Sequence, residues 1–240
     1  ASLRHELAGV EMARSPEDIA LFLVEVGEQR YAGSRDFRLT GVEDTDNGFV
    51  AQLTLEEPAL AAVLTATIDD EGLRLGLELS NAGGAPVDFK LAFPHLAGLA
   101  LSSDPVEDYY FFPYGGGVIA DRAAILHGGY GDHQVLYQVM DLYAPASGYG
   151  VYLRVDDDEG WHKNFELRKH IPGHAEQVPY SYIAQVRPEY QWVTTMLDPV
   201  EGTGMAVGYL RRTRAPGESF MPEAAVLAAH PGDWHVAMRR

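Results

Sequence analysis

The chain has 240 residues, with 18 Lys and Arg against 35 Asp and Glu, which gives a formal net charge of −17. This charge disfavours nucleic acids and anionic membrane surfaces as partners, because both require clustered basic side chains. There is no cysteine, which excludes disulfides and thiolate chemistry, and no apolar run approaches the ~18 residues that a membrane span requires.

The first element in chain order has two possible interpretations. Ser15-Pro16-Glu17-Asp18 has the residues of a helix start, with Ser as the N-cap, Pro in the first turn and an acid at the third position. The segment that follows, 19–26, is mostly apolar and contains three β-branched residues. That composition equally favours a strand that is buried on both faces.

Most of the remaining chain alternates between apolar and polar residues, which is the period of a strand with one face on the core. The alternation is clean over 49–55, 73–79 and 87–93, and weaker over 60–68, 135–143, 149–155, 178–186 and 204–210. Turn residues at 46–48, 69–72, 81–84 and 156–160 separate strand-like runs, and such short connections favour antiparallel hairpins. We therefore predict an all-β fold: one large antiparallel β-sandwich over residues 1–240, with few short helices.

The last predicted element is a helix near the end of the sequence. Asp233 is placed to cap a helix through Met238, and the sequence ends soon after, at Arg240. A capped helix of two turns at this position leads us to expect that the chain is a segment of a longer protein.

The common catalytic motifs are absent from the sequence. It contains no phosphate-binding loop and no Gly-x-Ser-x-Gly elbow, and we expect no cofactor. None of the glutamates, Glu166 and Glu176 included, lies in a context that marks it as one of the paired acids of a glycosidase. The acidic run 156–159 departs from the calcium-loop template at Gly160, so a solvated hairpin tip is favoured over an ion site.

The nine histidines do not predict a metal site. A Pro-Gly pair separates His170 from His174, which makes a shared helical face improbable, and His127 and His133 flank a glycine-rich loop. A metal requires three or four converging ligands. Scattered loop histidines are therefore the favoured interpretation, and we expect no metal.

The aromatic residues are the most informative candidates for binding. A dense block, 109–114, is followed at once by three glycines. Sugar rings combine an apolar face with a rim of hydroxyls, which suits aromatic platforms beside polar groups. A place in the core is the favoured role of the block as a whole, and ligand contact is the alternative, with 109–117 as the predicted loop at a sugar site. The candidate carbohydrate-binding residues are Tyr109, Tyr110, Tyr114, Trp161, His162 and Trp192.

Five stretches of the sequence, spread over most of residues 45–240, resemble a large bacterial glycoside-hydrolase-like family. They are Phe93–Leu96, Leu101–Asp104, Phe111–Gly117, Met140–Leu153 and Pro231–Ala237. In such proteins an N-terminal β-sandwich of the galactose-mutarotase-like supersandwich type precedes a (β/α)8 barrel, and Pro231–Ala237 is similar to the linker into the barrel. The resemblance implies that the catalytic acid pair lies on the barrel, so no catalytic residue is assigned here.

Three functions are consistent with these observations. The first is a non-catalytic domain that supports a glycosidase barrel and contacts carbohydrate, with the missing C-terminal catalytic domain as its partner. The second is a free-standing carbohydrate-binding module. The third is a sugar mutarotase or epimerase, which the supersandwich resemblance and the nine histidines suggest. The resemblance implies a His acid and a Glu base for mutarotases of this superfold, and no positions of this sequence match their motif. We favour an extracellular or periplasmic location slightly over a cytoplasmic one.

Overall fold

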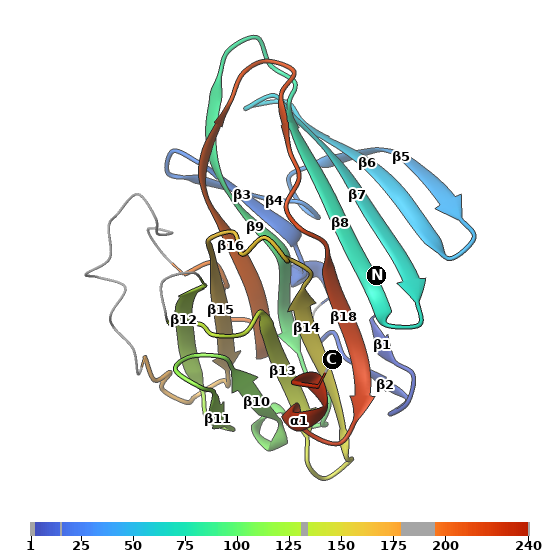
Figure 1. The fold of residues 1–240 in the computed structure, drawn as a ribbon, viewed down its shortest axis with the longest axis vertical. Helices are drawn as coiled ribbons and strands as arrows, with labels where there is room; N and C mark the ends of the chain where they lie inside the picture. Colours follow the sequence, from blue (N-terminus) through green and yellow to red (C-terminus); the bar gives the residue numbers. More distant parts are fainter. Residues whose placement is uncertain (1–2, 15, 131–133, 179–194, 240) are drawn as a thin grey trace.

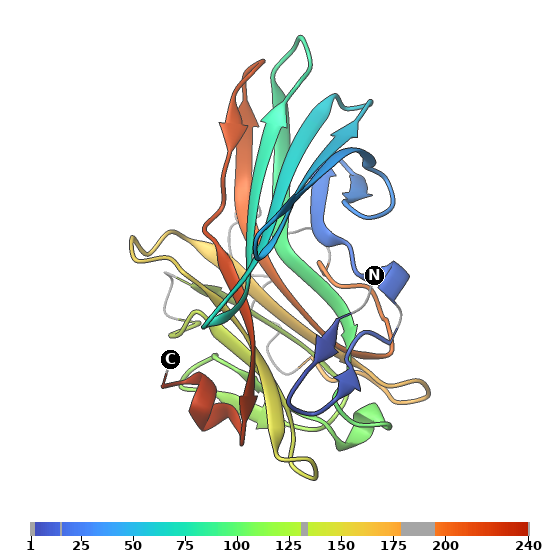
Figure 2. The ribbon, with the colours of Figure 1, turned by 90° about the vertical axis from the view of Figure 1, so that its right-hand side faces the viewer.

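The computed structural model of the chain describes residues 3–14, 16–130, 134–178 and 195–239. Within these residues nearly all regular structure is β-strand, arranged as two large antiparallel sheets that lie face to face (Figures 1 and 2). This arrangement confirms the predicted antiparallel β-sandwich. No helix in the described part is long and apolar enough to cross a membrane.

The larger sheet has ten strands among the described residues, in the order β11-β10-β13-β14-β18-β8-β7-β6-β5, with β17 also pairing with β8. The bounds of these strands are β5 Arg38–Thr45, β6 Gly48–Leu55, β7 Leu60–Asp69, β8 Gly72–Asn81, β10 Tyr109–Phe112, β11 Val118–Ala120, β13 Val139–Ala144, β14 Tyr149–Val155, β17 Ser219–Phe220 and β18 Ala225–Pro231.

The smaller sheet has six strands in the same described ranges, in the order β12-β15-β16-β9-β3-β4. Their bounds are β3 Leu21–Val26, β4 Gln29–Ala32, β9 Val87–Leu99, β12 Ala124–Tyr130, β15 Lys163–His170 and β16 Gly202–Arg214. A separate pair is formed by β1 (Arg4–His5) and β2 (Val10–Glu11), and the short helices are η1 (Pro16–Asp18), η2 (Pro105–Glu107) and α1 (Trp234–Ala237).

The hydrophobic core lies between the two sheets. Along β7 every second side chain is buried, as the period of two requires, so that Leu60 and Leu64 face the interior. Phe112 of the larger sheet and Phe89 and Phe165 of the smaller sheet are almost completely buried in the same cluster. Each such side chain contributes about 1.5–3 kcal/mol on burial, and together they hold the sheets face to face.

Two of the four predicted hairpins are wrong. The turns at 46–48 and 69–72 do join paired neighbours, β5 to β6 and β7 to β8. By contrast, 81–84 leads from β8 to β9 and 156–160 leads from β14 to β15, and in both cases the chain passes from the larger sheet to the smaller one. The same turn residues serve both connections, so local sequence does not distinguish a hairpin from a crossover.

A buried polar side chain anchors the first crossover. Asn81 donates hydrogen bonds to the carbonyl oxygens of Ala85 and Arg214, at 2.8 and 2.9 Å, and accepts one from the backbone N–H of Gly83 at 2.9 Å. Its amide group is thus satisfied inside the protein. The polar residues of the predicted turn fix a change of sheet.

The strand interpretation is confirmed at 19–26, where β3 is buried on both faces, and the helix alternative is limited to the three residues of η1. The strand predicted over 135–143 begins at Val139. The prediction of a glycine-rich loop directly after His127 is wrong, because β12 extends to Tyr130. The strand predicted over 178–186 lies almost entirely outside the described residues.

The prediction that one face of the strand at 87–93 is exposed is also wrong. In β9 Lys90 is only 3% exposed, and its amino group lies 2.8 Å from Oε1 of Glu25 on β3. A second apolar cluster, which includes Ala92, Ala206 and Leu197, covers the same face of the smaller sheet. A strand with a period of two is therefore buried on both sides here, because the segment around 196–200 lies over it.

The predicted C-terminal helix is confirmed as α1, on the outer face of the larger sheet (Figure 2). The Asp233 carboxylate accepts the backbone N–H of His235 at 3.1 Å, as an N-cap does. The ring of Trp234 stacks on Phe111 with centroids 5.1 Å apart. The helix thereby covers apolar side chains of β10, β14 and β18.

Candidate functional site

The three candidate tyrosines of the aromatic block do not share a face. Tyr110 is 1% exposed and lies in the core between the sheets. Tyr109 is partly exposed next to Tyr143, with ring centroids 5.7 Å apart, and alternation places it on the opposite face of β10. Tyr114 packs partly buried against the core. The predicted loop is wrong for residues 109–112, which form β10, and Tyr110 has no surface for stacking on a sugar.

The remaining predicted residues come from other parts of the chain. Trp161 and His162 lie in the crossover between β14 and β15, where Trp161 is 53% exposed and its indole N–H donates to Oε2 of Glu159 at 2.6 Å. Trp192 lies outside the described residues. The described candidates are thus spread over β10, the segment after it and the crossover between β14 and β15, and of these Tyr110 is buried between the sheets.

The acidic run 156–159 is not the solvated tip that the sequence predicted. The Asp156 carboxylate lies 2.5 Å from a guanidinium nitrogen of Arg74 and 2.8 Å from one of Arg154. Burial opposes its ionisation, but the hydrogen bonds and charges of the two arginines outweigh burial and hold the pKa of Asp156 below its usual range. Asp157 forms a buried ion pair with Lys163. Only the last two acids of the run are exposed.

A row of polar side chains crosses the outer face of the smaller sheet. Strand register places His127 opposite Glu166, Glu166 opposite Ala206, and Ala206 opposite His95. Directly opposite residues of antiparallel strands share a face. We refer to His127, Glu166 and His95 as the outer polar row. It spans about 14 Å, since neighbouring strands lie about 4.8 Å apart.

Glu166 is the centre of this row. Its side chain is 1% exposed, and its carboxylate accepts the backbone N–H groups of Met196 and Leu197 at 2.7 and 2.9 Å. Nδ1 of His127 lies 3.2 Å from the same carboxylate. Both oxygens of Glu166 are therefore engaged, and the carboxylate fastens the segment around 196–197 to the sheet.

His95 is held at the far end of the row. Its Nε2 lies 3.0 Å from the carbonyl oxygen of Met196. Burial lowers the pKa of His95, which keeps the imidazole neutral. In the neutral form Nε2–H donates to that carbonyl, and Nδ1 is a buried acceptor without a hydrogen-bond partner in the described part of the chain.

A second polar group ties the 171–177 segment to the same face. The guanidinium of Arg168 donates to both oxygens of Glu176, at 3.0 and 2.8 Å, and Nδ1 of His170 lies 2.8 Å from Oε1. Burial opposes ionisation of this acid, but the two bases outweigh it, so that the pKa of Glu176 is lowered. The bidentate pair fixes the end of a loop, 171–177, that lines a pocket.

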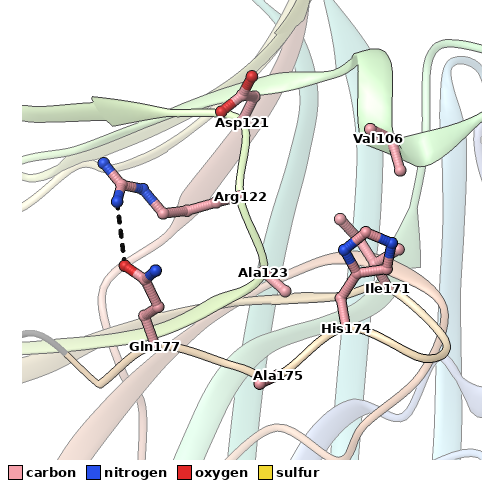
Figure 3. Close-up of a pocket in the computed structure, with 8 residues that line it drawn as sticks. All are labelled: Val106, Asp121, Arg122, Ala123, Ile171, His174, Ala175 and Gln177. Atoms are coloured by element: carbon pink, nitrogen blue, oxygen red, sulfur yellow. Dashed lines mark hydrogen bonds between the residues drawn. The ribbon is translucent and has the colours of Figure 1, made fainter.

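The pocket lies between this loop and the segment that leads into β12 (Figure 3), and has a volume of about 310 Å³. Figure 3 shows Arg122 and Gln177 on one side, joined by a hydrogen bond of 3.1 Å. Val106, Ile171 and His174 lie on the other side. The lining residues are Val106, Asp121, Arg122, Ala123, Ile171, His174, Ala175 and Gln177.

Lys169 lies next to this pocket with its side chain in the interior. Its amino group donates to the backbone carbonyl oxygen of Asp108 and is fully buried. Burial lowers the pKa of Lys169 to about 8, and the charges of Asp108 and Asp121 only partly oppose that effect.

The lowered pKa of Lys169 predicts a stability that rises with pH above 8. The unfolded chain keeps this proton to about pH 10.4, whereas the folded chain releases it near pH 8, so the unfolded state binds more protons between these values. Relative to Lys169→Met, the natural chain should gain about 1 kcal/mol per pH unit above pH 8. Urea unfolding of both proteins from pH 7 to 10 measures this difference, and a difference independent of pH would contradict it.

No three His, Cys, Asp or Glu side chains in the described ranges gather closely enough to hold a metal ion. The outer polar row and the pocket were both missed by the sequence analysis. They depend on strand register and on a loop returning to a distant strand, which no local spacing in the sequence reports. Neither His127 nor Glu166 lies in a segment that the sequence analysis predicted as a strand, so no signal in the sequence pointed to this pair.

No protein-family model matches the chain, and no curated protein matches it in sequence. Among solved structures, the α-galactosidase of Lactobacillus brevis is similar, with a TM-score of 0.54 and 12% identity over 88% of this chain and 29% of its own. The GH36 α-galactosidase AgaA of Geobacillus stearothermophilus gives 0.52 and 11%, over 88% and 30%. A galactose mutarotase-like protein of Lactobacillus casei gives 0.50 and 12%, over 95% and 92%.

These similarities confirm the fold that the resemblance implied, a galactose-mutarotase-like β-sandwich like that in the α-galactosidases. The chain spans about 30% of the length of those α-galactosidases. At such low identities the comparisons establish the fold and leave the function to the chemistry of this chain.

Proposed function

We propose that this chain is the N-terminal β-sandwich of a glycoside hydrolase, which supports a catalytic barrel and contacts carbohydrate without carrying the catalytic acid pair. The observation that carries the proposal is the pattern of coverage: 88% of this chain matches only 29–30% of the α-galactosidases. Those enzymes have a further two thirds of their chain outside the matched region.

The state of the buried acids supports a structural role for this chain. A glycosidase needs two carboxyl groups about 5–9.5 Å apart, facing the substrate. In the described residues the buried acids are each engaged by a base or by backbone N–H groups. These pairs are Glu25 with Lys90, Asp108 with the N–H groups of Leu101 and Ser102, Asp141 with His230, Asp157 with Lys163, and Glu166 with His127.

The test compares this 240-residue chain with the protein encoded by its complete gene. Both are assayed against a panel of 4-nitrophenyl glycosides that includes the α-galactoside. We expect no hydrolysis above the buffer rate by the 240-residue chain, and hydrolysis of at least one substrate by the complete protein. Turnover by the chain alone, or a reading frame that ends at Arg240, would overturn the proposal.

A sugar mutarotase or epimerase is the second candidate, favoured by one observation: His127 and Glu166 form a His–Glu pair at 3.2 Å on a sheet face of the mutarotase-like fold. A proton-transfer pair of this kind suits ring opening at the anomeric carbon. Against it, both Glu166 oxygens already accept backbone N–H groups.

Polarimetry with freshly dissolved D-galactose and D-glucose decides between the two functions. Mutarotation accelerated by the chain, and slowed at least about tenfold by Glu166→Gln, would establish the epimerase. Rates equal to those in buffer would exclude it, and would leave the glycosidase domain as the function of this fold. Glu56→Gln, at an exposed site, is the matched control and is expected to leave any rate unchanged.

A further inference from the structure

Strand β5 gives the larger sheet a long uncovered edge. It is the last strand of that sheet, on the right-hand side of Figure 1, and all but one of its eight residues are exposed. Among the described residues the other outermost strands are short or covered: β11 and β4 have three and four residues, and backbone hydrogen bonds of Val135 and Gln177 cover β12. A long strand with unpaired N–H and C=O groups is a template for pairing with another strand.

A bulge divides β5 into two halves. The register along β6 advances by only one residue between Leu39 and Gly41, which makes Thr40 an extra residue. The hydroxyl of Thr40 donates to the carbonyl oxygen of Gln52 on β6 at 3.0 Å and so holds the bulge in place. As a result, Leu39 and Val42 lie on the same face, whereas residues three positions apart in a regular strand lie on opposite faces.

The face that these two residues share is the inner side of the sheet. Their partners on β6, Leu53 and Ala51, pack against or within the hydrophobic cluster between the sheets. Leu39 and Val42 themselves are 56% and 57% exposed. The edge therefore presents two aliphatic side chains that cross-strand neighbours on a further strand would cover.

The outer face of the same edge carries opposite charges at its two ends. Register places Arg38 and Glu43 on the side that points away from the core. Both side chains are exposed, and neither forms an ion pair within the described ranges. The segment 38–43 is therefore self-complementary: a cation and an aliphatic residue at one end match an aliphatic residue and an anion at the other.

These features favour a second copy of this chain as the partner of the edge. A regular strand placed along β5 would match only one side of the bulge, because the extra residue moves the other side out of register by one position. A second β5 carries the same extra residue at the same place. In antiparallel pairing about a two-fold axis, both sides of the bulge stay in register.

We infer that two copies of the chain associate through antiparallel β5 strands, in the register that places Arg38 of each copy opposite Glu43 of the other. Leu39 of each copy then lies opposite Val42 of the other. Backbone hydrogen bonds between the two β5 strands join the two larger sheets into one. A pairing of six residues on each side is small beside the roughly 1,200–2,000 Å² of a standard interface, so we expect a dissociation constant of about 10–100 µM. The inference does not depend on the proposed function.

Sedimentation velocity of the 240-residue chain, from about 1 to about 300 µM, tests the association and should show a monomer that converts to a dimer. Arg38→Glu and Glu43→Arg should each weaken the dimer at least about tenfold, since each replaces two attractive contacts by two repulsive ones. The two changes combined restore opposite charges and should return the dissociation constant to within about threefold of the natural value. Glu28→Arg, at an exposed acid in the β3–β4 turn, is the matched control and should leave the dimer unchanged. Far-UV circular dichroism checks that each variant is folded.

Disulfide cross-linking tests the register. The chain has no cysteine, so Leu39→Cys and Val42→Cys each introduce a single thiol. An equal mixture of these two variants should form a cross-linked dimer of one with the other under mild oxidation, because directly opposite Cβ atoms lie about 4.5–5.5 Å apart. Either variant alone should cross-link much more slowly, because its two thiols are three positions out of register.

Four outcomes would overturn the inference. They are a monomer at about 300 µM, a dimer that Arg38→Glu does not weaken, a combined variant that does not regain association, and faster cross-linking of a single variant than of the mixture. The charge variants are also made in the complete protein. Association there that none of them changes would mean that the rest of the protein covers β5, and would likewise overturn it.

Discussion

Replacement of Asp157 by alanine is expected to destabilise the protein by about 3–5 kcal/mol, the cost of breaking a buried ion pair on one side. Its partner Lys163 is completely buried, and the Asp157 side chain is 1% exposed. Gln138 Oε1 and the carbonyl of Trp161 also accept from the ammonium, each at 2.9 Å. Neither carries a charge, so the variant leaves an uncompensated cation in the core. Urea unfolding at pH 7 measures the loss.

Two further variants distinguish the effect of the buried charges from the effect of changing the loop that carries them. Asp158→Ala changes the neighbouring acid, which is exposed, and should alter stability by less than 0.5 kcal/mol. Lys163→Met combined with Asp157→Ala removes both charges and should recover much of the loss. A double variant as unstable as Asp157→Ala alone would show that the crossover depends on the shape of these residues rather than on their charges.

Replacement of Glu166 by alanine should cost about 3–4 kcal/mol and release the segment around 196–197 from the sheet. The change leaves the buried N–H groups of Met196 and Leu197 without acceptors, and each unsatisfied group costs about 1–3 kcal/mol. Unfolding measures the stability. Hydrogen exchange of those two amides measures the release and should accelerate more than exchange in β7.

Glu56→Ala, at an exposed site in the connection between β6 and β7, is the control and should leave stability and exchange unchanged. Protection of Met196 and Leu197 that survives Glu166→Ala would mean that apolar packing, and not this carboxylate, holds the segment. Ala206 and Leu197 share a cluster under it and are the side chains that would then be responsible.

Both predictions concern charges at places where the sandwich departs from a simple pair of sheets. Asp157 and Lys163 lie where the chain crosses from β14 to β15, and Glu166 lies where a later segment returns over the outer face. Ionic groups in such places fix geometry, because a shifted backbone would leave them without partners. Some of the chain's many acidic residues therefore form ion pairs and hydrogen bonds inside the protein.

The sequence predicted the strands well because alternation is a local property. Leu73 to Leu79 lie in β8 as the period of two required, and the buried residues of β7 follow the same rule. The predicted helix after Asp233 formed because capping is also local. The predicted hairpins at 81–84 and 156–160 were wrong because which sheet the next strand joins is not a local property.

The residues of the candidate site show the same difference between properties that are local in the sequence and properties that depend on strand pairing. Tyr110 and Tyr109 are adjacent in the sequence, yet one lies in the core and the other on the opposite face of the strand. His127 and Glu166 are distant in sequence, yet register places them directly opposite each other. The first relation follows from the period of two once 109–112 is known to be a strand, which the sequence did not predict. The second depends on strand register, which a single sequence does not report.

The sequence by itself determined that this protein is a β-sandwich, because strand period, turn residues and capping depend on neighbours along the chain. Only the tertiary structure decided which acids are buried and paired, which aromatic residues remain accessible and where a pocket forms. Most of those properties arise from contacts between residues far apart in the chain, as in the pair of His230 with Asp141. Sheet register and crossovers determine such contacts, and the residues of a strand do not by themselves specify which strand it pairs with.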